Sequence, residues 1–277
     1  MPRYLNYYTA YYQKLQVFFS IYLAFFQKIV YNLWQELIFL IVSEKISENF
    51  VILQDTEKFK YGTDAVLLAD FANIKKHDTV VDLCSGTGAV GFLAFLRCSQ
   101  KHTTFVDIDS EMVELSEKTA ELNNISDKFS FIFSDIKNLR GIESNSVDYI
   151  TVNPPYFREN SGKINKNENI VNARHAYDFS LSDLFSISYK LLKDGGKVAI
   201  IQRADYLSEV IFEMKKNRIE PKRLRLIQSY SNKSANLFLL EGVKNGGIEL
   251  KCLPTLVLYN DKGMTEEFEK IQNARFR

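Results

Sequence analysis

Cysteine is scarce in this sequence, and the few cysteines present exclude two classes of protein. Cys84, Cys98 and Cys252 are odd in number and do not have the spacing of metal ligands. We recognise no secretory pattern, so we do not expect a small secreted domain held together by disulfides. We therefore expect reduced thiols, no metal site and a cytoplasmic location.

The chain also lacks a strong net charge. Its 35 Lys and Arg residues nearly balance its 34 Asp and Glu residues, which leaves a formal net charge of +1. The overall charge therefore does not indicate a nucleic-acid-binding protein, and any basic surface must be local. Internal repeats and low-complexity segments are absent too. With 46% hydrophobic residues, the 277-residue chain can bury a sizeable core.

An uninterrupted apolar run of membrane-spanning length is missing as well. Residues 17–42 are strongly apolar, but about 20 mostly apolar residues are needed to cross a bilayer. Five polar or charged residues interrupt the run: Gln27, Lys28, Asn32, Gln35 and Glu36. We expect residues 1–46 to form an atypical, aromatic-rich helical extension without stable membrane insertion. It is either an amphipathic helix that packs on the body or on a membrane surface, or an extension upstream of the natural start.

From residue 47 onward, strand-like and helix-like segments alternate. Expected strands are 79–83, 103–106, 129–133, 148–152 and 197–202, and expected helices are 65–71, 86–95, 110–123, 181–192 and 206–216. Such alternation predicts an α/β fold with a doubly wound, mostly parallel sheet. Later strand-like runs without long helices between them predict an antiparallel edge. We place this domain at residues 47–262 and a C-terminal tail at 263–277.

A turn of small residues, 84–88 (CSGTG), follows the first expected strand of this alternation. In open α/β sheets, ligands bind beyond the carboxyl ends of the strands, and small residues let the backbone approach them. Residues 86–91 match the dinucleotide pattern G-x-G-x-x-G, with Asp107 placed to hold a ribose hydroxyl. Asp82 favours another ligand, because its carboxylate would repel a pyrophosphate and suits the cationic methionine end of S-adenosylmethionine.

A second motif, Asn153, Pro154, Pro155 and Tyr156, follows the strand-like run that ends at residue 152. An exocyclic amino nitrogen is a poor nucleophile, because its lone pair is delocalised. The Asn153 side-chain oxygen and the Pro154 carbonyl can each accept one of its N–H groups, which positions the nitrogen for methyl transfer. The Tyr156 ring can stack on a base, and a base must be flipped out or single-stranded to enter. Adenine, cytosine and a glutamine amide all satisfy this chemistry.

The two motifs resemble those of known enzymes. Residues 82–88 resemble the first motif of class I S-adenosylmethionine-dependent methyltransferases, with Cys84 where that family often has glycine. Residues 153–156 resemble the fourth motif of amino methyltransferases. Together with residues 59–71 (FKYGTDAVLLADF) and 173–184, they make residues 48–260 similar to the bacterial methyltransferases that modify N6 of adenosine 37 in a valine tRNA.

This resemblance implies a Rossmann-like class I methyltransferase fold and S-adenosylmethionine as the cofactor. Residues 59–64 would close over its methionine end, and Asp135 would accept a hydrogen bond from its adenine amino group. The expected cofactor-binding residues are Tyr61, Gly62, Asp64, Asp82, Cys84, Ser85, Gly86, Gly88, Asp107, Ile108, Asp135, Ile136 and Asn153.

We expect the RNA to contact two basic segments. Residues 158–174 are polar and rich in Asn and Lys, and residues 215–225 hold the densest basic cluster, which also fits a solvated helix face. The expected RNA contacts are Tyr156, Lys163, Lys166, Arg174, His175, Lys215, Lys216 and Arg218. Direct chemistry by His175 is not required, because the product cation can lose its proton to water.

The leading hypothesis is thus a tRNA adenine-N6 methyltransferase whose partner is tRNA. A protein glutamine N5-methyltransferase stays open as an alternative, as does an enzyme that methylates DNA adenine or an rRNA amino group. A nicotinamide-binding oxidoreductase or a non-catalytic scaffold would be hypotheses of a different class.

Overall fold

The structure of the chain is a computed structural model that describes residues 41–47, 50–55, 62–155 and 180–274. Apart from residues 41, 42 and 55, these residues belong to one compact unit, Ser43–Gln54 with Lys58–Arg277. The expected helical extension lies outside the described residues up to position 40, and residues 41–47 form a strand. Within the described part, none of the helices combines the length and the apolar character needed to cross a membrane.

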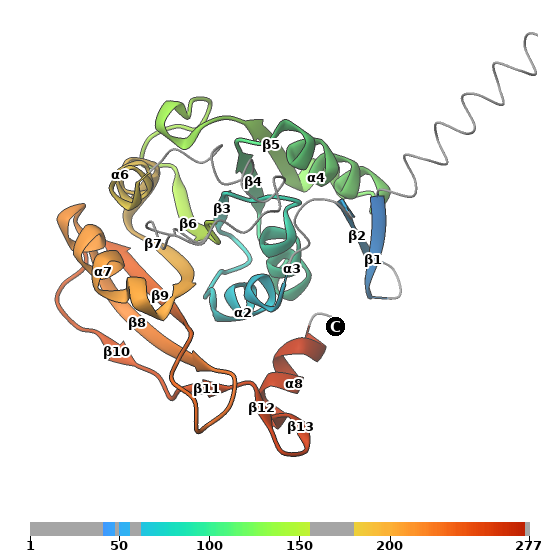
Figure 1. Ribbon diagram of the computed structural model, residues 1–277. Coiled ribbons are helices and arrows are strands. Elements are labelled where there is room, and N and C mark those ends of the chain that lie inside the picture. Colours follow the sequence, from blue (N-terminus) through green and yellow to red (C-terminus); the bar gives the residue numbers. More distant parts are fainter. Residues whose placement is uncertain (1–40, 48–49, 56–61, 156–179, 275–277) are drawn as a thin grey trace, which may run out of the picture. The chain divides into compact units, whose positions relative to one another are not determined.

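A nine-stranded sheet forms the centre of this unit (Figure 1). Its strand order is β10-β8-β9-β7-β6-β3-β4-β5, with β11 paired to β8. The strands are β3 (Thr79–Leu83), β4 (His102–Asp107), β5 (Phe129–Phe133), β6 (Val147–Val152), β7 (Leu192–Arg203), β8 (Ile219–Gln228), β9 (Leu237–Lys244), β10 (Lys251–Cys252) and β11 (Leu256–Val257). The five strands from β7 to β5 are parallel, whereas β9 is antiparallel to both β7 and β8. The predicted mostly parallel sheet is confirmed, and β9 is its antiparallel element.

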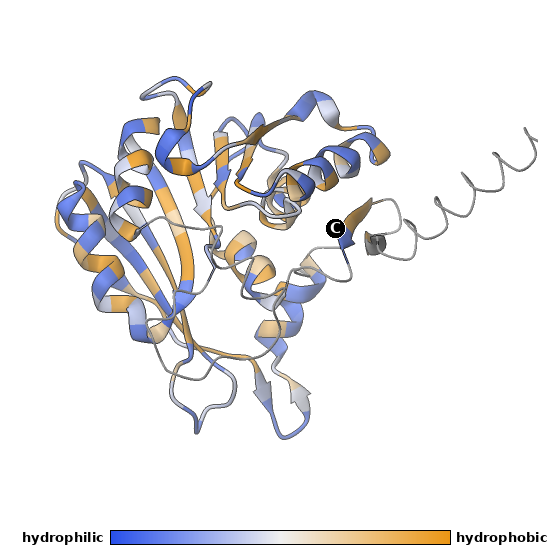
Figure 2. Cartoon of the chain, turned by 45° about the horizontal axis from the view of Figure 1, so that its top comes forward, coloured by the Kyte–Doolittle hydropathy of each residue, from blue (hydrophilic) through white to orange (hydrophobic). Residues whose placement is uncertain are grey.

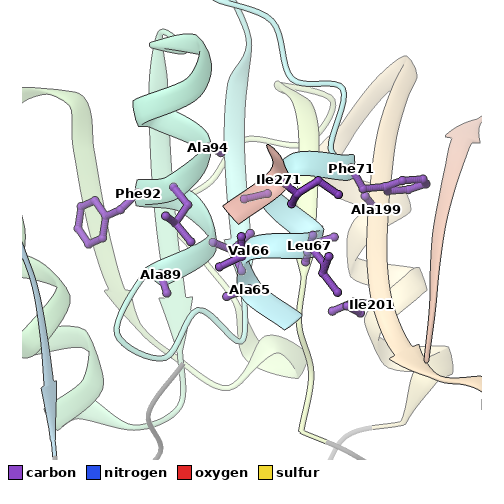
Figure 3. Close-up of a cluster of buried hydrophobic side chains, with 14 of the residues drawn as sticks. Ala65, Val66, Leu67, Phe71, Ala89, Phe92, Ala94, Ala199, Ile201 and Ile271 are labelled. Atoms are coloured by element: carbon purple, nitrogen blue, oxygen red, sulfur yellow. The ribbon is translucent and has the colours of Figure 1, made fainter. Parts of the chain in front are cut away.

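Helices cover both faces of the sheet, and a buried apolar cluster lies under each layer. The helices are α2 (Thr63–Phe71), α3 (Ala89–Cys98), α4 (Ser110–Leu122), α6 (Leu181–Leu191), α7 (Leu207–Lys216) and α8 (Glu266–Asn273). One cluster joins α2, α3 and α8 to β7, through Leu67, Phe92, Ile271 and Ile201 among others (Figure 3). The other cluster joins α6 and α7 to the opposite face. Apolar residues accordingly run along the central strands in Figure 2.

Smaller elements complete the described unit. They are the paired strands β1 (Ile41–Ser47) and β2 (Phe50–Asp55), the hairpin of β12 (Tyr259–Asn260) and β13 (Gly263–Met264), and the 3-10 turns η1 (Ser126–Lys128), η2 (Ile136–Asn138) and η3 (Ala204–Tyr206). Three of the expected helix starts were wrong: α3 begins at Ala89, α2 at Thr63 and α7 at Leu207. The later start of α3 has a clear cause, because residues 85–88 form a turn. That turn is closed by a 2.8 Å hydrogen bond from Gly88 N to the Ser85 carbonyl.

Close packing of α3 on the sheet depends on one glycine. A Cβ atom added to Gly91 would lie 2.2 Å from Cε1 of Phe105 on β4, far inside van der Waals contact. The side chains around this point are Phe92, Phe105 and Phe129, whose rings contact one another at centroid distances of 4.8 to 5.3 Å. Gly91 therefore sets how near the start of α3 lies to the strands, and with it the position of the preceding turn.

The segment beyond residue 262, which we predicted as a tail, contains β13 and α8. Phe268 and Ile271 of α8 are buried in the same cluster as α2 and α3. Thr265 caps the helix by accepting a bond from Phe268 N. The domain boundary at residue 262 stays a prediction, and α8 beyond it packs on the same hydrophobic core as α2 and α3.

Candidate active site

The segments that follow four neighbouring strands lie at one edge of the sheet, which we call the carboxyl edge. Leu83 of β3 pairs with Val106 of β4 and with Val152 of β6, and Asp107 of β4 pairs with Phe133 of β5. Because these strands are parallel, their carboxyl ends meet there. The structure thus places the predicted cofactor turn (84–88) next to the predicted reactive stretch (153–155), with Asp107 and Asp135 on the other side.

The cofactor turn is held in a left-handed backbone conformation. Gly86 and Gly88 have φ angles of 53° and 78°, and Cys84 has a φ angle of 56°. Glycine adopts such angles freely, whereas a side chain makes them uncommon. This accounts for the glycine that often occupies the position of Cys84 in the enzymes the motif resembles. Burial raises the pKa of the Cys84 thiol, and the nearby carboxylates of Asp107 and Asp82 raise it further, so this cysteine stays protonated.

Asp107 ties the turn to the end of β4. Its Oδ2 accepts a 2.7 Å hydrogen bond from Gly86 N, and its Oδ1 accepts a 2.9 Å bond from Asp109 N. The residue is 1% exposed. An acid that is fixed at this point of the sheet is compatible with the predicted ribose contact, and it also shapes the turn directly.

Asp82 supports the turn from the strand before it. Its Oδ1 accepts a 2.6 Å bond from the Thr151 hydroxyl, and its Oδ2 accepts a 3.3 Å bond from Gly91 N. Burial raises the pKa of Asp82 to about 7, although these two donors oppose the shift; the charge of Asp107 adds to it. Asp82 therefore links β3 to β6 and α3, and a cation above the turn would favour its ionised form.

Two features of the turn fit a ligand that approaches the backbone closely. The Ser85 hydroxyl oxygen is buried, and it has no hydrogen-bond partner within the described part of the chain. A Cβ atom added to Gly86 would meet no heavy atom of the described residues within 4 Å. Unmet hydrogen-bonding capacity and open space against the backbone are what a bound cofactor such as S-adenosylmethionine would use.

The predicted adenine contact lies after β5. Asp135 is half-buried and caps η2, because its Oδ1 accepts a 2.9 Å bond from Lys137 N. The Lys137 ammonium lies 3.8 Å from the other carboxylate oxygen. Ile136 is buried and Ile108 is half-buried. These positions share the carboxyl edge with the turn, and their contact with a cofactor stays a prediction.

The reactive stretch begins directly after β6. Asn153 and Pro155 are half-buried and Pro154 is buried. Val152 pairs with Leu83 on one side and with Ile200 of β7 on the other. The stretch therefore continues from the centre of the sheet, beside the cofactor turn.

Several predicted residues cannot be placed, and others lie near the start of α2. Tyr61, Tyr156, Lys163, Lys166, Arg174 and His175 lie outside the described residues. Gly62 is exposed and precedes α2, and Asp64 lies in the first turn of that helix. Burial raises the pKa of the Asp64 carboxyl.

The structure does not bring the basic cluster of Lys215, Lys216 and Arg218 to the carboxyl edge. These residues end α7 and precede β8, which runs parallel to β7 because both are antiparallel to β9. The start of β8 is therefore at the opposite edge, which we call the amino edge. Two of the three cations also have acidic partners: Lys215 Nζ lies 3.0 Å from the Glu220 carboxylate, and Lys216 Nζ lies 3.0 Å from the Glu213 carboxylate.

Two polar residues near the site were not expected from the sequence. Thr151 donates to Asp82, a role that only the pairing of β3 with β6 creates. Gln202 follows the Ile200–Val152 pair by two residues and is fully buried. Its amide nitrogen has no partner among the described residues, while its oxygen accepts a 2.9 Å bond from Arg203 N. In the sequence, Gln202 could have been noticed as a polar amide at the end of the apolar run 198–202.

Two similar sequences carry the same description. The chain is 29% identical over 189 residues to the tRNA1(Val) (adenine(37)-N6)-methyltransferase of Trichodesmium erythraeum, which covers 63% of this chain and 76% of that protein. It is 28% identical over 198 residues to the enzyme of the same name from Phocaeicola vulgatus, with 66% and 82% covered.

Solved structures agree on the fold. A predicted O-methyltransferase from Agrobacterium tumefaciens superimposes with a TM-score of 0.63 at 20% identity, over 77% of this chain and 97% of that one. The tRNA m1G37 methyltransferase of M. jannaschii superimposes with a TM-score of 0.54 at 16% identity, over 75% and 55%. These likenesses confirm the expected class I methyltransferase fold.

The comparison with family models covers most of the site. The model of the methyltransferase small domain matches residues 56–217, which is more than half of the chain. The matched range contains the cofactor turn, the acids at the strand ends and the reactive stretch. The predicted class of enzyme, an S-adenosylmethionine-dependent methyltransferase, is thereby confirmed, and the chain belongs to the methyltransferase small domain family.

Proposed function

We propose that the chain transfers a methyl group from S-adenosylmethionine to the N6 amino group of an adenine in tRNA, in the cytoplasm. The observation that carries the proposal is the placement of Asn153 and Pro154 directly beyond β6, beside the cofactor turn at the carboxyl edge. The relatives named for methylation of adenosine 37 in a valine tRNA support that nucleotide as the target. The catalytic domain in this proposal is residues 47–262.

The cofactor turn would hold the methyl donor. S-adenosylmethionine, when bound, supplies an electrophilic methyl group on a sulfonium. The Ser85 hydroxyl and the open space beside Gly86 are available to the cofactor. Asp107 holds the conformation of the turn by accepting a hydrogen bond from Gly86 N. Asp82, near the end of β3 just before the turn, is a buried acid whose ionised form a cation would stabilise.

The reactive stretch would hold the amino group. In the proposed site the Asn153 side-chain oxygen and the Pro154 carbonyl each accept one N–H of the adenine amino group. This fixes the nitrogen and favours a more tetrahedral geometry there, without a covalent enzyme intermediate. Pro154 and Pro155 stiffen the segment and carry no N–H that would compete for these acceptors. After transfer, the nitrogen loses a proton to water, so no protein base is needed.

The test is an incubation of the full chain with radiolabelled S-adenosylmethionine and either total tRNA or total cell protein. We expect label in tRNA, and N6-methyladenosine after digestion to nucleosides. A valine tRNA transcript in which adenosine 37 is replaced by guanosine is the matched control and should take up no label. Label in protein glutamine instead would establish the glutamine alternative and reject the proposal.

A further inference from the structure

The loop between β8 and β9, residues 229–236 (SYSNKSAN), lies at the same edge of the sheet as the reactive stretch. Ala204 N, just beyond the end of β7, donates a 3.0 Å bond to the Asn236 carbonyl, and Asn236 N donates a 3.0 Å bond to the Ile227 carbonyl. β8 is three strands away from β6 in the sheet. Strands lie about 4.8 Å apart, so the loop begins about 14 Å to the side of Asn153. That is within the reach of nucleotides that flank a base held at the site.

Tyr230 in this loop has an exposed aromatic side chain that packs against another ring. Its exposed fraction is 45%. The ring contacts Tyr259 at a centroid distance of 5.9 Å, and Tyr259 in turn contacts the buried Phe268 edge-on at 5.8 Å. A side chain that rests on a row of rings loses little entropy when it binds. Exposed aromatic rings next to a nucleic-acid site stack on bases with little dependence on base identity.

Lys233 in the same loop is an exposed cation without an acidic partner in the described part of the chain. Its backbone is fixed, because Lys233 N donates a 3.0 Å bond to the Tyr230 carbonyl and Gln228 Nε2 donates a 2.8 Å bond to the Lys233 carbonyl. The loop contains no Asp or Glu. Arg203 at the end of β7 and Asp205 of η3 balance each other, because they form a 2.6 Å ion pair. The loop therefore presents one uncompensated positive charge beside one supported ring.

We propose that the loop of residues 229–236 is a contact surface for the RNA substrate, with Tyr230 stacking on a base and Lys233 pairing with a phosphate. A ring and a cation on a fixed loop, with no acid between them, match the alternation of bases and phosphates along a single strand. The inference rests on the proposed function and names a surface for its substrate. It replaces Lys215 and Lys216, which lie at the other edge and are paired with acids.

The test is equilibrium binding of a valine tRNA to the full chain, measured by fluorescence anisotropy at several salt concentrations. We expect Tyr230→Ala to weaken binding about tenfold. Tyr230→Phe, which keeps the ring, should bind like the wild type. Lys233→Ala should weaken binding and lower the slope of log affinity against log salt by about one. Lys76→Ala, in an exposed loop that precedes β3 at the amino edge, and Phe212→Ala, an exposed ring on α7, are the matched controls and should change neither quantity.

Cofactor affinity and the melting temperature of each variant show whether it is folded. If Tyr230→Ala and Lys233→Ala bind tRNA as the controls do while N6-methyladenosine still forms, the inference is overturned and the proposed function stands. If both variants weaken tRNA binding but no N6-methyladenosine forms with the wild type, the surface is supported and the proposed function fails. A chain that binds no tRNA at all overturns both.

Discussion

At the carboxyl edge of the sheet, two buried polar side chains keep hydrogen-bonding capacity unused, whereas Lys215, Lys216 and Lys244 at the amino edge are paired with neighbouring groups. The Ser85 hydroxyl and the Gln202 amide nitrogen are both buried at the carboxyl edge, and neither has a partner among the described residues. At the amino edge the buried Lys244 ammonium donates to Asn145 Oδ1 at 2.5 Å and to the Leu192 carbonyl at 2.8 Å. Lys215 is likewise paired with Glu220 there.

The difference separates a ligand site from a structural surface. An unpaired buried polar atom costs free energy, so it is retained where a ligand supplies the missing partner. A count of basic residues along the sequence points to the amino edge, because that is where Lys215, Lys216 and Arg218 lie. The ion pairs of those residues argue against an RNA site there, since two of the three cations are already paired with nearby acids. Pairing with acids, and not the number of cations, distinguishes Lys215 and Lys216 from Lys233.

The largest effect should follow from loss of the side-chain acceptor in the reactive stretch. We expect Asn153→Ala to lower kcat about 100-fold or more, a loss comparable to removal of a preorganised transition-state hydrogen bond. The affinity for S-adenosylmethionine should stay near the wild-type value, because the cofactor turn is intact. Single-turnover methylation and calorimetric titration with the cofactor measure the two quantities. The matched control is Asn73→Ala, an exposed asparagine before β3 at the amino edge. Near-normal turnover in Asn153→Ala would make our assignment of the reactive stretch wrong.

The next effect concerns the cofactor turn. Asp107→Ala removes the acceptor for Gly86 N and Asp109 N, so the turn loses its anchor to β4. We expect the affinity for S-adenosylmethionine to fall about tenfold to a hundredfold, as for a lost hydrogen bond to a charged group. The rate at saturating cofactor should fall much less. Calorimetric titration of the variant with S-adenosylmethionine measures the loss. An unchanged dissociation constant would mean that Asp107 does not belong to the cofactor site.

Much of the carboxyl edge was predictable from the sequence, because it depends on local patterns. An apolar strand that carries an Asp or Asn at or just beyond its carboxyl end occurs four times, at Asp82, Asp107, Asp135 and Asn153, and a parallel sheet brings such strand ends together. The roles of Thr151 and Gln202 depend on which strands are neighbours. The bond from Thr151 to Asp82 exists only because β6 pairs with β3 in this register.

The location of the basic cluster could not be predicted for a related reason. Its residues are close in sequence, and their spacing describes a helix end equally well at either edge. Only the order β8-β9-β7, with β9 reversed, puts the start of β8 at the amino edge. The helix α8 was missed because it is short, and because its burial depends on Phe268 and Ile271 contacting a core built by residues 65–93.

A moderate effect should appear in the pH dependence of stability. In an unfolded chain an aspartate titrates near pH 4, whereas burial raises the pKa of Asp82 to about 7 in the folded state. The folded state then binds more protons between these values. The free energy of unfolding therefore falls as pH rises through that range, by at most about 1.4 kcal/mol per pH unit, and the contribution of Asp82 levels off above pH 7.

The variant Asp82→Asn isolates this contribution. Its side chain does not titrate, so the free energy of unfolding of the variant minus that of the wild type should increase from pH 5 to pH 7 and then level off. Urea denaturation at pH 5, 6, 7 and 8 measures both proteins. A difference that does not vary with pH would show that Asp82 titrates in its ordinary range when folded.

The smallest effect is expected at the amino edge, and it tests the comparison most directly. The double variant Lys215→Ala, Lys216→Ala removes two cations whose charges are already balanced by Glu220 and Glu213. Exposed ion pairs contribute little, so we expect tRNA affinity and its salt dependence to change less than about twofold. The same anisotropy titration that tests Lys233→Ala measures it. A loss of tRNA affinity as large as that of Lys233→Ala would mean that the RNA reaches the amino edge, and that the pairing of a lysine with a neighbouring glutamate does not prevent it from binding phosphate.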